Sequence, residues 1–143
     1  MSARLGNPQL ITAAAAALGV AAGRTISLGN GAQWALLLSL VLTYVASATA
    51  GNRIVILTIK DAAGNIVWQN WNNGAVNITA GAAAKLIAPV WQSNSSGGGG
   101  VPQDAYFLPD QMAIPPNSTL TVQDLANIDV NDTVQLNSAA LSY

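Results

Sequence analysis

The sequence predicts an all-β fold, an antiparallel β-sandwich of jelly-roll-like type preceded by an Ala-rich N-terminal arm. Three observations favour it. Short apolar segments alternate with turns rich in Gly, Pro and Asn along most of the chain. The longest apolar segment carries its polar residues with a period of two. No sustained helical pattern follows residue 24. These patterns are typical of many short strands packed in two layers.

Length and composition predict one domain whose surface meets other proteins. The 143 residues are enough for a single hydrophobic core. Hydrophobic residues make up 51% of the chain and charged residues only 8%, where soluble domains usually have about 25% charged residues. A surface with so few charges is poorly suited to a soluble monomer. We therefore expect much of it to be covered by protein.

The Ala-rich segment 1–24 is predicted to be an N-terminal arm, and residues 25–143 the sandwich domain. Asn7-Pro8 is a plausible helix start, but short isolated helices are marginal in water. No wide stripe of large apolar residues could dock such a helix. We expect the arm to become ordered against a neighbouring subunit, and a frayed terminus is the alternative. Residues 10–22 also resemble a signal-peptide core, although only one basic residue precedes them.

Residues 33–50 are predicted to form the long central strand. The polar residues occupy odd positions, Gln33, Ser39, Thr43, Ser47 and Thr49, and the even positions hold Trp34, Leu36, Leu38, Leu40, Leu42 and Tyr44. This period of two favours a strand, although the uncharged stretch 32–50 is long enough for a membrane helix. Strands usually have about 5–6 residues. We therefore expect this one to bend, to carry a bulge or to cross the whole sandwich.

The remaining strands are expected between strong turn signals. Residues 53–60 and 66–71 are predicted to pair as a hairpin, because Asp61-Ala62-Ala63-Gly64-Asn65 has the signature of a short hairpin loop. Pro89 predicts an edge or a break in the strand 85–92, and residues 93–100 are expected to form an exposed loop. Further short strands are expected at 26–28, 75–79, 106–108, 112–114, 120–122 and 134–136, with turns at 29–31, 72–74 and 115–117.

The residue types argue against catalysis. The chain contains no His, Cys or Glu, which removes the commonest acid–base groups and metal ligands. Lys60 and Lys85 are the only lysines that could activate a Ser or Thr nucleophile. We expect no enzyme activity and identify no catalytic, cofactor-binding or metal-binding residues. The net charge of −1, without a basic cluster, also predicts no nucleic-acid partner.

Asp124, Asp129 and Asp132 lie close together in sequence and could offer oxygen ligands to calcium. Their spacing is not that of a calcium loop, and no bidentate Glu exists in the chain. Asp and Asn in turns commonly accept hydrogen bonds from their own backbone amides. Turn stabilisation is therefore the preferred interpretation of these carboxylates.

The tryptophans are expected in the core or in a subunit interface. They are Trp34, Trp68, Trp71 and Trp91. A stacking surface for nucleic-acid bases would need interleaved basic residues, which this chain lacks. An alternative remains open, in which exposed Trp91 and the loop 93–100 recognise host carbohydrate as part of a tail- or fibre-associated binding module.

Several segments resemble one known family. Residues 48–68, ATAGNRIVILTIKDAAGNIVW, together with Phe107-Leu108-Pro109 and residues 114–122, IPPNSTLTV, are similar to small β-sandwich virion proteins of tailed bacteriophages. In that family a Gly-Asn-Arg turn, an apolar strand and an Asp-x-x-Gly-Asn hairpin precede a closing region of the form Leu-Pro … Pro-x-x-x-x-Leu. The match consists mostly of hairpin motifs, and residues 1–24 lie outside it.

The resemblance implies a structural role in the virion and transfers no catalytic residue. A capsid cement or decoration protein of this kind would lie on the capsid surface and bind the major capsid protein. It would also bind copies of itself, and we expect a homotrimer. No cofactor, nucleic acid or membrane is implied.

Overall fold

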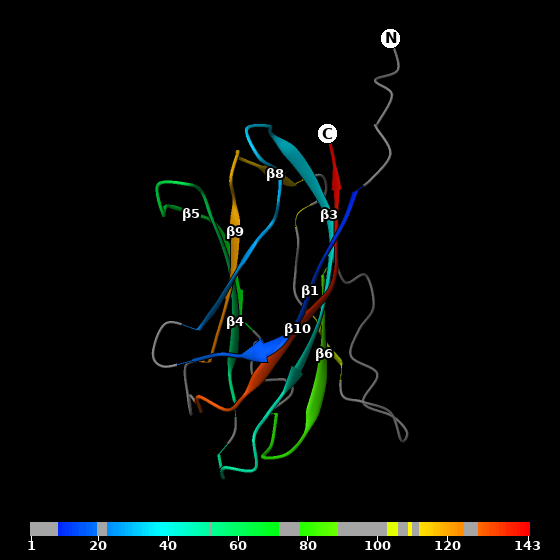
Figure 1. The fold of residues 1–143 in the computed structure, drawn as a ribbon. Helices are drawn as coiled ribbons and strands as arrows, with labels where there is room; N and C mark the ends of the chain where they lie inside the picture. Colours follow the sequence, from blue (N-terminus) through cyan, green and yellow to red (C-terminus); the bar gives the residue numbers. More distant parts are fainter. Residues whose placement is uncertain are drawn as a thin grey trace.

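The all-β prediction is confirmed. The computed structural model describes residues 9–19, 23–51, 53–71, 78–88, 103–105, 109, 112–124 and 129–143. Within these ranges the regular structure consists of ten strands and no helix. The strands form two sheets that pack face to face, as Figure 1 shows. The architecture is therefore a β-sandwich.

The two sheets differ in size. The larger has the order β1-β10-β3-β6-β7 with β8 also paired to β3, and the smaller has the order β2-β9-β4-β5. Among the described pairs, all are antiparallel except β6 with β7, which is parallel. The strands of the larger sheet are β1 (Gln9–Ala17), β3 (Ala35–Val45), β6 (Ala83–Ala88), β7 (Gln103–Ala105), β8 (Met112–Ile114) and β10 (Thr133–Ser142). Those of the smaller are β2 (Arg24–Ser27), β4 (Val55–Lys60), β5 (Ile66–Trp71) and β9 (Thr119–Asp124).

The core lies between the inner faces of the two sheets. Leu40 and Leu42 of β3 are fully buried, as are Leu57 and Ile59 of β4 and Val122 of β9. Each such side chain contributes about 1.5–3 kcal/mol relative to full exposure. Burial of these apolar side chains is the main stabilising term of the sandwich.

A β-bulge in β3 reverses which side chains face the core. Opposite β3, Ala140 pairs with Ser39 and the next residue of β10, Leu141, pairs with Leu37, so Leu38 is the extra residue. Before the bulge the odd-numbered Ala35 and Leu37 are buried. After it the even-numbered Leu40, Leu42 and Tyr44 are buried.

The bulge also divides the pairing of β3, with β8 alongside the first part and β6 alongside the second. The predicted bulge is confirmed. The expectation that all even positions share one face is wrong, because one inserted residue shifts the alternation. The stretch considered as a membrane helix is this strand, and the described residues include no helix long and apolar enough to cross a membrane.

Residues 9–17 form a strand of the larger sheet, which differs from the arm expected over residues 1–24. β1 pairs antiparallel with β10 of the same chain and lies at the edge of the sheet. Ile11 packs against the core, and Leu18 just beyond the strand is buried in it. An edge strand needs only one row of backbone hydrogen bonds and a few inward side chains, so a run of small Ala residues suffices. Residues 1–8 and 20–22 lie outside the described ranges.

Two predicted turns are confirmed. In the β4–β5 hairpin the Asp61 carboxylate accepts hydrogen bonds from the amides of Ala63 and Asn65 at 2.9 and 2.8 Å. Gly64 has φ 86°, as such a loop requires. The turn at 115–117 places Asn117 at φ 55°. The expectations for 72–77, 89–102 and 106–108 fall outside the described residues.

Candidate functional site

The outer face of the larger sheet carries exposed apolar side chains and no charged residue on β1, β10 and β3. We use the term outer face for the side chains of β1, β3 and β10 that point away from the smaller sheet. Leu10 is 71% exposed, and Leu38 and Val45 are 37% and 38% exposed. No Asp, Glu, Lys or Arg occurs in the sequences of β1, β3, β8 or β10. The polar groups between them are uncharged, and the Thr43 hydroxyl donates to Asn137 Oδ1 at 2.9 Å.

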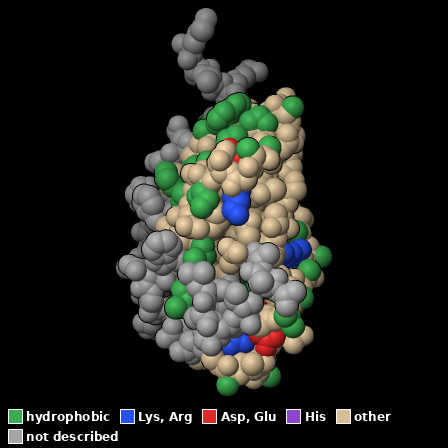
Figure 2. Space-filling model, turned by 90° about the vertical axis from the view of Figure 1, so that its left-hand side faces the viewer, with side chains coloured by type: hydrophobic (Ala, Val, Ile, Leu, Met, Phe, Trp, Pro, Cys, Tyr) green, Lys and Arg blue, Asp and Glu red, His purple; other side chains and the backbone are tan. Residues whose placement is uncertain are grey.

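Such a face suits contact with protein. Burying a charge in an interface costs free energy unless it is paired, and this face has no charge to bury over β1, β3 and β10. Contiguous exposed apolar patches commonly mark interaction sites, whereas the exposed apolar side chains on this face stand apart, so the absence of charge is its distinguishing property. Figure 2 shows the side over the smaller sheet, where Lys, Arg and Asp side chains are visible at several places and hydrophobic side chains gather toward the upper end.

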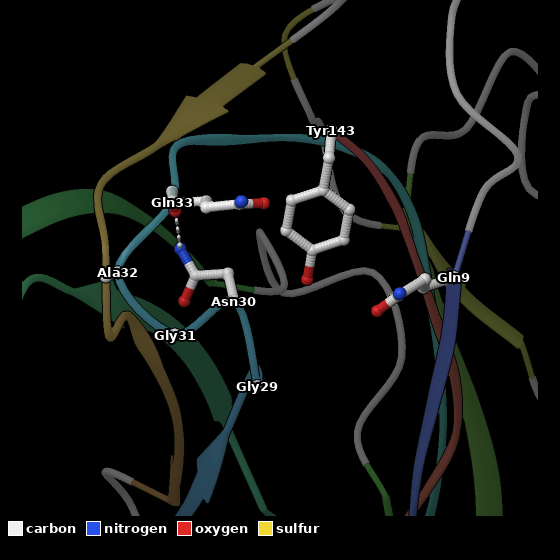
Figure 3. Close-up of a pocket in the computed structure, with 7 residues that line it drawn as sticks. All are labelled: Gln9, Gly29, Asn30, Gly31, Ala32, Gln33 and Tyr143. Carbon is white, nitrogen blue, oxygen red and sulfur yellow. Dashed lines mark hydrogen bonds between the residues drawn. The ribbon is translucent and has the colours of Figure 1, made fainter.

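A pocket of about 580 Å³ lies at the end of the sandwich where β3 begins and β10 ends. It is lined by Gln9, residues 29–33 and Tyr143. Figure 3 shows the Tyr143 ring between the side chains of Gln9 and Gln33, with Asn30 beneath them. The pocket therefore combines one aromatic ring with several side-chain amides. These groups come from the start of β1, the loop before β3 and the residue after β10, which are far apart in sequence.

Asn30 fixes the floor of this pocket. It is almost fully buried, and its side-chain amide donates to the carbonyl of Gln33 at 3.1 Å and to that of Pro115. Its Oδ1 accepts from the Ser118 amide at 3.0 Å. The β2–β3 loop is thereby held to the β8–β9 turn. A second tie between the same loops is the Asn117 amide, which donates to the Gly31 carbonyl at 2.8 Å.

The remaining polar side chains of the pocket are available to a ligand. Gln9, Gln33 and Tyr143 are all exposed. In the part of the chain that the structure describes, their side chains make no hydrogen bond. The pocket thus presents free amide donors and acceptors around a phenol ring, on a floor whose own polar groups are already satisfied.

A buried ion pair occupies the opposite end of the sandwich. Arg53 Nε lies 2.9 Å from Asp132 Oδ2, and both side chains are fully buried. A second contact joins the guanidinium to Asp132 Oδ1 at 3.1 Å. The same carboxylate accepts from the Tyr44 hydroxyl and from the Ser47 amide, each at 2.6 Å. The Arg53 guanidinium also donates to the Thr49 carbonyl at 3.0 Å.

These contacts explain the ionisation of the carboxyl groups. Burial on its own would raise the pKa of Asp132, but hydrogen bonds from Arg53, Ser47 and Tyr44 together hold that pKa below its ordinary value. Hydrogen bonds from the Thr49 hydroxyl and the Asn131 amide lower the pKa of Asp129, as does the Ser47 hydroxyl at 2.7 Å. Both groups are therefore carboxylates at neutral pH, held by protein donors.

Two members of the acidic cluster considered for calcium, Asp129 and Asp132, make these structural contacts. Asp129 and Asp132 lie in one turn, where the Asp132 amide donates to the Asp129 carbonyl at 3.0 Å. Asp129 Oδ1 accepts from the Asn131 amide at 2.9 Å. Among the described residues, no group of three or more potential metal ligands is found. The Asp124 side chain is not described.

The other sequence candidates are scattered. Trp68 is buried in the core as expected, whereas Trp34 is 63% exposed just before β3. Lys60 ends β4 of the smaller sheet and Lys85 lies in β6 of the larger, so the two lysines belong to different sheets. Trp91 and the loop 93–100 lie outside the described residues, and so does the side chain of Trp71.

Sequence reasoning missed both the pocket and the ion pair. Arg53 and Asp132 are 79 residues apart, and Gln9 and Tyr143 meet only because β1 pairs with β10. No local spacing signals such contacts. No protein-family model matches the chain, and no curated protein or solved structure shows significant similarity to it.

Proposed function

We propose that this protein is a non-enzymatic structural protein of a tailed-bacteriophage virion, a cement or decoration protein on the capsid surface. The single observation that carries the proposal furthest is the outer face of the larger sheet, which exposes apolar groups and no charge over β1, β3 and β10. The resemblance of residues 48–68 and 114–122 to small virion proteins supports the same role.

The proposed partners are the major capsid protein and copies of this chain, arranged as a homotrimer. Stable protein interfaces bury about 800 Å² per partner, and their centres are depleted of charge. Leu38 and Val45 lie on one strand of the outer face, and Leu10 lies on β1, two strands away across β10. Leu38 and Val45 are seven residues apart on β3, roughly 23 Å along the strand, so these side chains would be separate apolar contact points, and the Thr, Asn and Gln side chains between them would supply uncharged polar contacts.

The decisive experiment compares virions with and without the protein. Quantitative mass spectrometry of purified particles is expected to find it in hundreds of copies, the number that a regular capsid position requires, and particles from a deletion phage are expected to lose DNA at a lower temperature. A copy number of only a few per particle would overturn the capsid assignment. Deletion particles with unchanged thermal stability would overturn the cementing role.

A further inference from the structure

We propose that the pocket between Gln9, Gln33 and Tyr143 is a binding site for a neutral saccharide. The proposal does not depend on the structural role in the virion, because the pocket lies at one end of the sandwich and is defined by its own residues. A decoration protein with such a site would be able to attach a particle to sugar-bearing surfaces as well as to stabilise it.

The size of the pocket suits a small organic ligand. Its volume of about 580 Å³ falls within the range of roughly 300–1,000 Å³ that is usual for ligand pockets, and the site is widely open to the solvent, so a bound ligand would keep one face exposed. Its floor is preorganised, because Asn30 uses its amide to hold the two loops that meet there. A ligand would therefore enter a site that does not have to be assembled first, which reduces the entropic cost of binding.

The chemistry of the pocket selects for a neutral ligand rich in hydroxyl groups. None of the lining residues is a Lys, Arg, Asp or Glu, so no side chain could compensate the charge of a phosphate or a carboxylate. The side-chain amides of Gln9 and Gln33 each donate and accept hydrogen bonds. A sugar hydroxyl also donates and accepts, so amides are matched partners for it.

The Tyr143 ring supplies the apolar part of the contact. Figure 3 shows it standing between the two glutamines, so that a ligand held by both amides would lie against it. A saccharide ring has an apolar face of C–H groups beside its equatorial hydroxyls, and an aromatic ring covers such a face while its phenol oxygen remains free to hydrogen-bond. The same constellation would discriminate against a purely apolar ligand, because the amides would lose their water without gaining partners.

The test is ligand-observed NMR with the full chain and a panel of probes. The neutral probes are the methyl glycosides of glucose, galactose, mannose and N-acetylglucosamine, and the charged probes are N-acetylneuraminic acid and glucose 6-phosphate. We expect saturable binding of at least one neutral probe with a Kd of about 1 mM or tighter, and none of the charged probes. Absence of saturable binding by every neutral probe, or equal binding of charged ones, would overturn the proposal.

Variants locate the binding. Gln33→Ala and Tyr143→Ala are expected to weaken binding about tenfold each, which corresponds to one lost contact. Tyr143→Phe is expected to weaken it less, because the ring is kept. Gln69→Ala is the matched control, an exposed glutamine on β5 of the smaller sheet and away from the pocket, and should bind as the unaltered chain does. Equal binding by all variants would place the sugar elsewhere. If Gln33→Ala instead changes the oligomeric state and no sugar binds, the pocket is a protein contact and the proposal fails.

Discussion

Arg53 and Asp132 form a two-point ion pair in which both side chains are fully buried. The pair joins the loop that precedes β4 to the turn that precedes β10. It therefore ties the smaller sheet to the larger at one end of the sandwich. Because both side chains are fully buried, each charge depends on the other for compensation.

Removing one member of this pair should strongly destabilise the protein. Arg53→Met alone, or Asp132→Leu alone, is expected to lower the free energy of unfolding by about 3–5 kcal/mol, because the remaining charge stays buried without its partner. The double variant should lose less than the sum of the two single variants. Urea denaturation followed by tryptophan fluorescence measures all three. Additive losses would show that the two side chains act independently.

Acid should destabilise the fold through the same carboxylates. The pKa values of Asp61, Asp129 and Asp132 all lie below the ordinary 3.8, so the unfolded chain takes up protons before the folded one. Stability is then complete above the unfolded pKa and is lost as pH falls through the folded values. The free energy of unfolding is expected to stay level from neutral pH to about pH 5 and to decline below about pH 4. A flat profile down to about pH 2 would contradict this.

Two glycines with the same backbone angle should differ in their tolerance of Ala. Gly19 and Gly23 both have φ 72°, where a side chain costs about 1–2 kcal/mol. A Cβ at Gly19 would meet nothing within 4 Å, but one at Gly23 would lie 2.2 Å from the Val122 carbonyl oxygen. Gly23→Ala is therefore expected to lower the thermal midpoint clearly more than Gly19→Ala. Equal shifts in calorimetry would mean that β9 moves away without cost.

Charge on the outer face should block assembly without unfolding the chain. Leu38→Lys and Val45→Lys change side chains that are 37% and 38% exposed, so the ammonium group can reach the solvent and each variant should lose about 1 kcal/mol of unfolding free energy. Incorporation into virions is expected to fall at least tenfold, measured by mass spectrometry of particles from complemented deletion phage. The control is Ile66→Lys, at a residue of the smaller sheet that is 58% exposed and should be incorporated normally. Normal incorporation of all three would exclude the outer face from the capsid contact.

Local sequence patterns predicted the local structure well. The hairpin around Asp61 follows from turn chemistry within five residues, and β5 spans residues 66–71 as predicted. β1 escaped prediction because Ala has little strand preference of its own, and its place at the edge depends on β10 being there to pair with it. The exposure of Trp34 was not predicted, because the alternation of residues in β3 does not show where a bulge interrupts it.

The candidate sites depended even more on long-range contacts. The pocket needs the ends of β1 and β10 beside the loop that precedes β3, which is a property of the strand order. The ion pair needs Arg53 and Asp132 to meet across 79 residues. Composition shows only that charged residues are few; it does not show that one Asp and one Arg are buried together and join the two sheets.

Because of the bulge at Leu38, the positions of β3 that tolerate substitution follow opposite odd–even patterns on its two sides. Upstream of it an odd-numbered residue such as Leu37 belongs to the core, and downstream an odd-numbered residue such as Val41 belongs to the surface side. Leu37→Ser should therefore destabilise the fold, whereas Val41→Ser should mainly change the chemistry of the surface. Deleting Leu38 would remove the extra residue, so Ser39 would follow Leu37 and one continuous alternation would keep Leu37 and Leu40 both facing the core.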